Sequence, residues 1–251
     1  MLRAARFVGW LVLLIPVLAA GQSPGPAAAV LSADEQFARI HNNLSVQADE
    51  MISAGLPFAG ESAKPVAAQP DLREQYQAEG PAALTKAAAR VRLLMPVIAP
   101  ILREEGVPAE LAGVVLVESG GLPAALSPKG ARGLWQFMPA TARRYGLVVS
   151  AERDDRLDVD KSTRAAARYL RDLRGQFGTW ELVFAAYNAG EQTLTRALSR
   201  SRVGDFSAVK AFLPMETQNY VPAVTSAVEL LKTGNWEASG KALVLFAEAR
   251  F

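Results

Sequence analysis

The sequence contains no cysteine and a single histidine, His41, among its 251 residues. The absence of cysteine excludes a disulfide framework, a zinc-thiolate site, a thiol nucleophile and a lipid anchor attached through cysteine. His41 lies beside the apolar stripe of an expected helix, which favours a packing role over metal ligation or base catalysis. Any reaction of this chain must therefore depend on carboxyl and hydroxyl groups, and we predict no metal and no cofactor.

Long apolar runs are also scarce. The uncharged stretch from Phe7 to Ala20 follows Arg3 and Arg6, and it is shorter than the roughly 20 apolar residues that a membrane-spanning helix needs. A basic start, an apolar core and small residues at its end are typical of a secretory signal. We therefore predict a signal peptide at residues 1–20 and an exported protein. An uncleaved anchor is the alternative, and it would place the chain near the membrane.

The chain has no net charge once the two arginines of the signal are set aside, because the remaining basic and acidic residues are equal in number. The distribution is uneven: residues 31–80 carry eight acidic and three basic residues, whereas residues 81–205 carry thirteen and eighteen. The larger part is mildly cationic, which favours an anionic partner. No run of Lys and Arg alternates with aromatic residues, so we predict no nucleic-acid partner.

The apolar spacing along the chain is helical, without sustained period-two alternation. Residues 21–81 are predicted to form a flexible leader, a helix that begins at the capping pair Ser32 and Glu35, and a proline-rich linker. Residues 82–232 are predicted to form the main domain, and residues 233–251 a C-terminal tail. Within the main domain we expect helices at 82–95, 97–105, 109–119, 139–145, 161–175, 180–189, 191–200 and 222–232.

One of these helices ends in a carboxylate. Residues 109–118 are apolar on every face apart from Glu110 and Glu118, and Gly120 follows as a stop. Burial and the negative end of the helix dipole both disfavour a charged Glu118, so its pKa is expected to lie above the usual value of about 4.3. A carboxyl that stays protonated near neutral pH is a general acid. The alternative is a solvated Glu at a helix end.

A partner carboxylate is missing nearby, because Glu118 is the only acidic residue between Leu111 and Ala151. Glycosidases with paired carboxylates place the two groups about 5 to 9.5 Å apart. If no distant segment supplies the second group, the substrate itself must stabilise the positive charge at the sugar carbon, as an N-acetyl group does in substrate-assisted enzymes.

Four motifs in order carry a resemblance to a known family. They are Glu118-Ser119, SPKGARGLWQFMPATA at 127–142, AYNAG at 186–190 and ETQNYVP at 216–222. Over residues 84 to 232 the sequence resembles the lytic transglycosylases, and GLWQ together with residues 154–170 is most similar to the branch typified by membrane-bound lytic transglycosylase D.

The resemblance implies a mainly α, lysozyme-like helical domain of the goose-type lysozyme and lytic transglycosylase kind, with little or no β structure. It implies cleavage, without water, of the β-1,4 bond between N-acetylmuramic acid and N-acetylglucosamine in peptidoglycan glycan strands, which leaves 1,6-anhydromuramoyl ends in the periplasm or cell wall.

The resemblance also implies roles for individual residues. Glu118 matches the catalytic acid and base, and Tyr187 matches a tyrosine that hydrogen-bonds and orients that carboxyl. The residues that match positions lining the sugar-binding groove are Ser127, Gln136, Met138, Asn188, Glu216 and Tyr220.

Several alternatives stay open. A goose-type muramidase would share Glu118 but admit water, a non-catalytic peptidoglycan-binding module would bind without cleaving, and a chitin-directed glycosidase would act on polymers without muramic acid.

Trp135 is either a sugar-stacking platform or a core residue. The acidic cluster at 154–160 lacks the order of an EF-hand, which favours helix caps and salt links to Arg153, Arg156 and Arg164 over calcium. The arginines at 164, 168, 171 and 174 are expected to form a solvated face.

Overall fold

The computed structural model describes residues 69–201, 203–233 and 236–249. All of them lie in the second of the two units into which the chain divides, Met51–Phe251. The predicted signal peptide, the leader and the helix that carries His41 lie outside the described residues.

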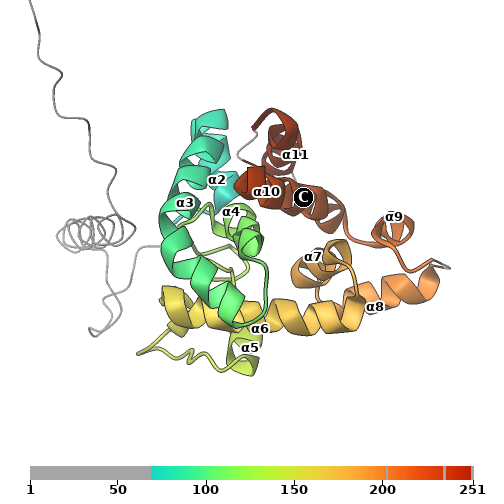
Figure 1. The fold of residues 1–251 in the computed structure, drawn as a ribbon, viewed down its shortest axis with the longest axis horizontal. Helices are drawn as coiled ribbons and strands as arrows, with labels where there is room; N and C mark the ends of the chain where they lie inside the picture. Colours follow the sequence, from blue (N-terminus) through green and yellow to red (C-terminus); the bar gives the residue numbers. More distant parts are fainter. Residues whose placement is uncertain (1–68, 202, 234–235, 250–251) are drawn as a thin grey trace, which may run out of the picture. The chain divides into compact units, whose positions relative to one another are not determined.

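The described part is built from helices and the loops between them (Figure 1). The α-helices are α2 (Leu72–Glu79), α3 (Pro81–Glu104), α4 (Gly113–Ser119), α5 (Pro139–Arg144), α6 (Val159–Phe177), α7 (Trp180–Ala189), α8 (Glu191–Arg200), α9 (Phe206–Val209), α10 (Met215–Thr233) and α11 (Trp236–Glu248). Short 3-10 helices cover Ala109–Ala112, Asp155–Leu157 and Lys210–Phe212. β-Pairing in these residues is limited to isolated bridges, so the predicted mainly α class is confirmed.

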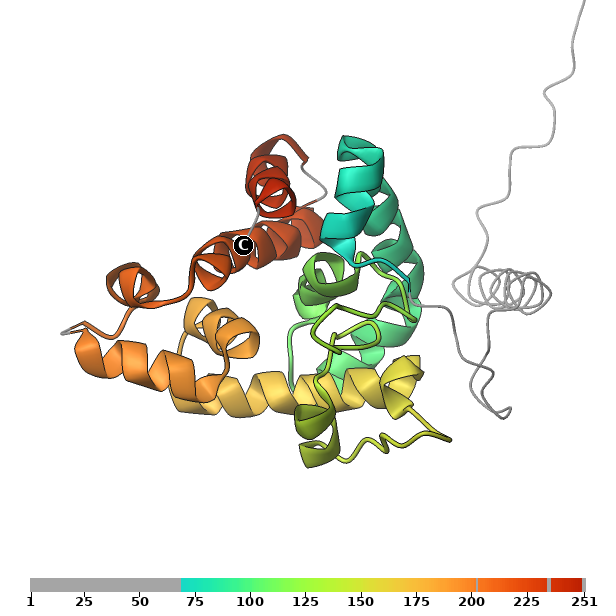
Figure 2. The same cartoon turned by 180° about the vertical axis from the view of Figure 1, so that it is seen from behind.

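Helix α4 carries Glu118 and lies among the other helices. It contacts α10, α3 and α2, and both Figure 1 and Figure 2 show it between α3 and α10. Val114, Val115 and Leu116 are fully buried, and burial of such a side chain contributes about 1.5–3 kcal/mol. A helix that is apolar all round has to be enclosed, as the sequence predicted.

A single helix, α3, replaces the two helices predicted at 82–95 and 97–105. Pro96 and Pro100 both lie inside it. A proline removes the hydrogen bond to the carbonyl four residues earlier and costs about 3 kcal/mol or more, which is why the local sequence predicts a break. Ile98 and Leu102 are fully buried in the core, and their tertiary contacts favour the continuous helix.

Helix α10 also runs through a proline. The sequence predicted a helix from residue 222, but α10 begins at Met215 and contains Pro222. Val221 and Val224, on either side of the proline, are buried. Tyr220 therefore lies within a helix packed on α4 and not in a loop before it.

The packed helices extend past the predicted domain boundaries at both ends. Residues 72–79, predicted as linker, form α2, which begins with a capping box made by Asp71 and Glu74. Residues 236–248, predicted as a tail, form α11, which packs on α10 and α2. The core includes Leu72 from α2 and Phe246 from α11, so both helices belong to the same hydrophobic cluster as α4.

The contact between α4 and α10 depends on Gly113. A Cβ atom at this position would lie 2.6 Å from the backbone nitrogen of Val228 and 2.9 Å from the carbonyl carbon of Ala227. Because neither backbone atom can move without shifting a helix, we expect Gly113→Ala to lower the free energy of unfolding by about 1–3 kcal/mol in urea denaturation.

Gly175→Ala is the matched control for this prediction. Gly175 also lies in a helix, α6, but a Cβ there would meet nothing within 4 Å. Alanine in an exposed helix is more stable than glycine by about 0.5–1 kcal/mol, so this variant should gain stability. An equal gain in Gly113→Ala would contradict the close approach of α4 to α10.

Candidate active site

Glu118 is the second-last residue of α4, and the end of this helix is held by side chains from two other helices. Gln75 of α2 donates to the carbonyl of Ser119 at 3.3 Å, and Arg90 of α3 donates to the carbonyl of Gly120 at 2.7 Å. The Arg90 guanidinium also donates to the side-chain oxygen of Gln75. These donors satisfy carbonyls that have no partner within the helix, and the cation complements the negative end of the dipole.

The carboxyl of Glu118 has a pKa raised to about 7. The largest cause is desolvation by burial, and a hydrogen bond from Tyr220 acts in the opposite direction. The charges of Glu216 and Asp71 raise this pKa further, whereas the charge of Arg73 lowers it. The result agrees with the raised pKa predicted from the sequence, and it keeps a large share of the carboxyl protonated at neutral pH.

Tyr220 makes the direct contact with this carboxyl. Its hydroxyl donates to Oε1 of Glu118 at 2.6 Å, across 102 residues of sequence. The Tyr220 ring is buried and packs edge-on against Phe246 of α11, with ring centroids 5.9 Å apart. Packing against α11 thus fixes the position of the Tyr220 ring, and its place in α10 directs the hydroxyl toward Glu118.

The role expected for Tyr187 requires correction. The resemblance placed the hydrogen bond to the catalytic carboxyl on Tyr187, but its hydroxyl donates to the backbone carbonyl of Trp135 at 2.7 Å. Tyr187 still lies within electrostatic reach of the site, because the charge of Glu118 is one cause, after burial, of its raised pKa. The packing of α7 directs this hydroxyl to the loop before α5, and α10 supplies the tyrosine that meets Glu118.

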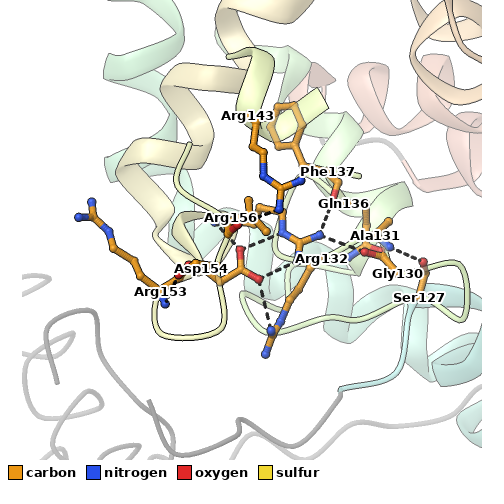
Figure 3. A network of polar contacts seen from close by, with 12 residues as sticks. Ser127, Gly130, Ala131, Arg132, Gln136, Phe137, Arg143, Arg153, Asp154 and Arg156 are labelled. Atoms are coloured by element: carbon orange, nitrogen blue, oxygen red, sulfur yellow. Dashed lines mark hydrogen bonds and ion pairs between the residues drawn. The ribbon is translucent and has the colours of Figure 1, made fainter. Parts of the chain in front are cut away.

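Ser127, Gln136 and Met138 lie together in the loop that joins α4 to α5. The Ser127 side chain accepts a hydrogen bond from the Ala131 backbone at 3.0 Å, as Figure 3 shows. The Gln136 amide donates to the carbonyls of Ala125 and Gly133 at 3.1 and 2.8 Å. Met138 is 43% exposed. Ser127 and Gln136 therefore shape the loop, while Met138 offers an apolar surface to solvent.

Asn188 and Glu216 connect elements around the carboxyl. Asn188 at the end of α7 accepts a hydrogen bond from Thr217 of α10 at 2.7 Å. Glu216, one residue earlier, lies 3.7 Å from Arg73 of α2 and 3.1 Å from Lys129 of the loop. Glu216 therefore links three segments that surround Glu118.

Arg73 is a site residue that the sequence interpretation missed, because it fell within the predicted linker. Its guanidinium lies 4.2 Å from the ring centre of Phe246 and pairs with Glu216. The available signal was the spacing of Asp71 and Glu74, which is a capping box for a helix that begins at residue 72.

Two of the open alternatives are resolved by burial and contacts. Trp135 is fully buried, and its indole nitrogen donates to Thr163 of α6 at 3.0 Å, so it is a core residue. The acidic cluster makes the expected caps and salt links: Asp154 pairs with Arg156, Asp155 with Arg153, and Asp160 with Arg164.

Of the α6 arginines predicted to form a solvated face, Arg168, Arg171 and Arg174 are exposed, whereas Arg164 is half-buried. Arg164 pairs with Glu104, and Arg168 and Arg171 pair with Glu105, at the end of α3. Within the described ranges, no three His, Cys, Asp or Glu side chains come close enough together to hold a metal ion. A surface hollow between α2 and α11, lined by Tyr76, Gln77, Ala247 and Glu248, contains none of the predicted site residues.

Comparison with known proteins finds similarity to the same family that the sequence motifs resemble. Residues 95–209 match the family model "Transglycosylase SLT domain". The chain is 38% identical over 140 residues to membrane-bound lytic murein transglycosylase D of Escherichia coli K12, an alignment that covers 54% of this chain and 30% of that protein. It is 38% identical over 113 residues to a putative tributyltin chloride resistance protein of Alteromonas sp. strain M-1, covering 45% of this chain and 55% of the relative.

A solved structure also matches, that of an inactive mutant of lytic transglycosylase Slt from Pseudomonas aeruginosa. It is 25% identical, with a TM-score of 0.47, over 57% of this chain and 24% of the other. No helix within the described ranges is both long enough and apolar enough to cross a membrane.

Proposed function

Residues 95–209 match the transglycosylase SLT domain model, and we propose that the protein is a peptidoglycan lytic transglycosylase in which Glu118 acts first as general acid and then as general base. The observation that carries the proposal is the Glu118 carboxyl itself, which is desolvated at the end of a buried helix, has a pKa of about 7 and is held by Tyr220. A group with this pKa is present in both protonation states near neutral pH, as a residue that gives and then takes a proton requires.

The proposed reaction needs no water. Protonated Glu118 gives its proton to the oxygen of the β-1,4 bond while the bond from that oxygen to C1 of N-acetylmuramic acid breaks. The 2-acetamido oxygen bonds to C1 and stabilises the positive charge, as in substrate-assisted glycosidases. The C6 hydroxyl then attacks C1, the acetamido group leaves, and the Glu118 carboxylate takes the hydroxyl proton. The products are a free 4-hydroxyl and a 1,6-anhydro end.

The neighbouring carboxylates support a mechanism with one catalytic acid. Glu216 and Asp71 are the acidic residues whose charges raise the pKa of Glu118. Glu216 is paired with Arg73 and Lys129, and Asp71 accepts a hydrogen bond from the backbone of Glu74 at 3.0 Å. Both carboxylates are thus occupied in structural contacts, which is consistent with a reaction in which the substrate supplies the second group.

The remaining site residues are proposed either to contact the glycan or to fix the segments around Glu118. Met138 supplies an exposed apolar surface for a sugar face. Ser127, Gln136, Tyr187, Asn188 and Glu216 act mainly by fixing the loop and the helix ends around Glu118. The substrate is a glycan strand of peptidoglycan, and the signal peptide predicted at residues 1–20 would deliver the enzyme to the periplasm or cell wall.

Product masses test the reaction. Purified protein incubated with peptidoglycan sacculi should release soluble muropeptides with 1,6-anhydromuramoyl ends, identified by mass spectrometry. A muramidase would instead release products heavier by one water, with reducing ends that borohydride converts to alcohols. Binding to sacculi without release would favour a non-catalytic module, and either result would overturn the proposed reaction.

A further inference from the structure

A buried guanidinium forms hydrogen bonds with two separate positions in the loop that precedes α5. Nη1 of Arg156 donates to the carbonyl oxygens of both Gly130 and Phe137, each at 3.0 Å (Figure 3). Arg156 is only 6% exposed, although it lies in the short 3-10 helix before α6 and outside the loop itself. One side chain therefore spans the loop from residue 130 to residue 137.

Asp154 holds this guanidinium in place. Its carboxylate accepts hydrogen bonds from Nε and Nη2 of Arg156 at 2.8 and 2.7 Å, a two-point pairing that fixes the plane of the guanidinium. Asp154 also accepts from Arg132 within the loop at 3.3 Å. Burial is the largest single influence on the pKa of Asp154 and raises it, but the hydrogen bonds and charge of Arg156, together with the charge of Arg132, lower it by more, so the carboxylate stays charged.

The loop needs such support because parts of its backbone are unfavourable on their own. Gln136 adopts a positive φ of 47°, which is uncommon for any residue other than glycine. At Gly133, a Cβ would lie 1.9 Å from the carbonyl oxygen of Arg156, so the loop backbone touches the segment that carries the guanidinium. The fold holds Gln136 in a conformation that the local sequence does not favour.

We propose that Arg156, fixed by Asp154, is a positioning residue for the sugar-facing loop 127–138, and that it acts on substrate binding and not on the proton transfer of Glu118. The guanidinium is suited to this task because it donates to two backbone carbonyls and to one carboxylate at the same time, from a rigid plane. A lysine would keep the charge beside Asp154 but not this fork of donors. The expected effect on substrate binding rests on the proposed function, because the substrate is a peptidoglycan glycan. The expected effect on the stability of the loop does not depend on that function.

Arg156→Lys tests the proposal, with Arg153→Lys as the matched control. Arg153 lies on the same segment but is exposed, and its guanidinium forms its hydrogen bonds and ion pair with Asp155 and not with the loop. We expect Arg156→Lys to raise KM for soluble peptidoglycan glycan strands about tenfold, the loss equivalent to one good hydrogen bond, while kcat changes less than about twofold. The pH dependence should be unchanged, and the control should match wild type.

Hydrogen exchange of the loop gives a second, independent measurement. The Ser127 and Phe137 amides, which donate to Ala131 and Arg132, should exchange at least about tenfold faster in Arg156→Lys, because local opening requires less free energy. A lower kcat with unchanged KM would mean only a loss of folded enzyme, and unchanged exchange would mean that Arg156 does not hold the loop. Either result overturns the proposal. If wild type cleaves no peptidoglycan, the proposed function is wrong. The hydrogen-exchange rates and the affinity for glycan strands then still test whether Arg156 positions the loop.

Discussion

Glu118→Gln is expected to abolish the release of muropeptides from peptidoglycan while leaving the fold intact. Glutamine has nearly the same shape as glutamate but has no acidic proton to give and cannot take one back. General acid or base assistance contributes about 10² to 10⁴ in rate, and the proposed reaction uses the same group in two steps. Soluble products measured over a time course at pH 6 should therefore fall by at least this factor.

The stability of the variant provides the internal check. The pKa of Glu118 is raised in the folded protein, so the stability associated with its protonated form is present below the unfolded pKa of about 4.3 and is lost as pH rises to about 7. Glutamine stays neutral at every pH, and Glu118→Gln should be at least as stable as wild type at pH 8. The control Glu181→Gln removes an exposed carboxylate from α7 and should keep full activity. Muropeptide release by Glu118→Gln at more than a tenth of the wild-type rate would refute the assignment of Glu118.

Tyr220→Phe is expected to have the second-largest effect, because the Tyr220 hydroxyl donates to the atom that becomes charged when Glu118 gives up its proton. A hydrogen bond to a charged group contributes about 1.5–3 kcal/mol, and most of this is gained only as the carboxylate forms. Its loss should lower kcat by about 10- to 100-fold. The same loss raises the pKa of Glu118, so the decline of activity on the alkaline side should move to higher pH.

Tyr187→Phe is the matched control, because it removes a buried hydroxyl that binds the Trp135 carbonyl and not the carboxyl. We expect a smaller loss of activity and no movement of the alkaline limb. Profiles of kcat against pH for both variants decide between the two tyrosines. If Tyr187→Phe moves the limb and Tyr220→Phe does not, the role inferred from the family resemblance is correct and the hydrogen bond from Tyr220 is not functional.

The elements best predicted from sequence are those whose signals lie within a few residues. Helices α7 and α8 have the predicted bounds, because Thr179 caps the first and Gly190 separates the two. Helix α4 was predicted as buried, with Glu118 near its end, since its apolar run is continuous and Gly120 follows it. The raised pKa of Glu118 depends mainly on burial, so it could be predicted from that same run.

The predictions that failed depend on contacts between distant segments. Pro96 and Pro222 indicated helix boundaries because a proline costs a hydrogen bond locally, yet α3 and α10 continue through them with buried residues on either side. Helix α11, predicted as a tail, provides the ring of Phe246 against which Tyr220 and Arg73 pack. No pattern in residues 236–248 indicated a role near Glu118.

Local signals in the chain were therefore sufficient for its helical class, its family resemblance and its single candidate acid. They were insufficient to say which tyrosine reaches that acid, because Tyr187 and Tyr220 both belong to matching motifs. That choice depends on how the two helices are rotated and packed: α10 packs on α4, with the close approach at Gly113, and α7 packs on α10 and α6. The same packing lets Arg156 donate hydrogen bonds to loop carbonyls that lie 19 and 26 residues away from it in the chain. Hydrogen bonds over such separations follow from the relative placement of helices, which only the folded protein defines.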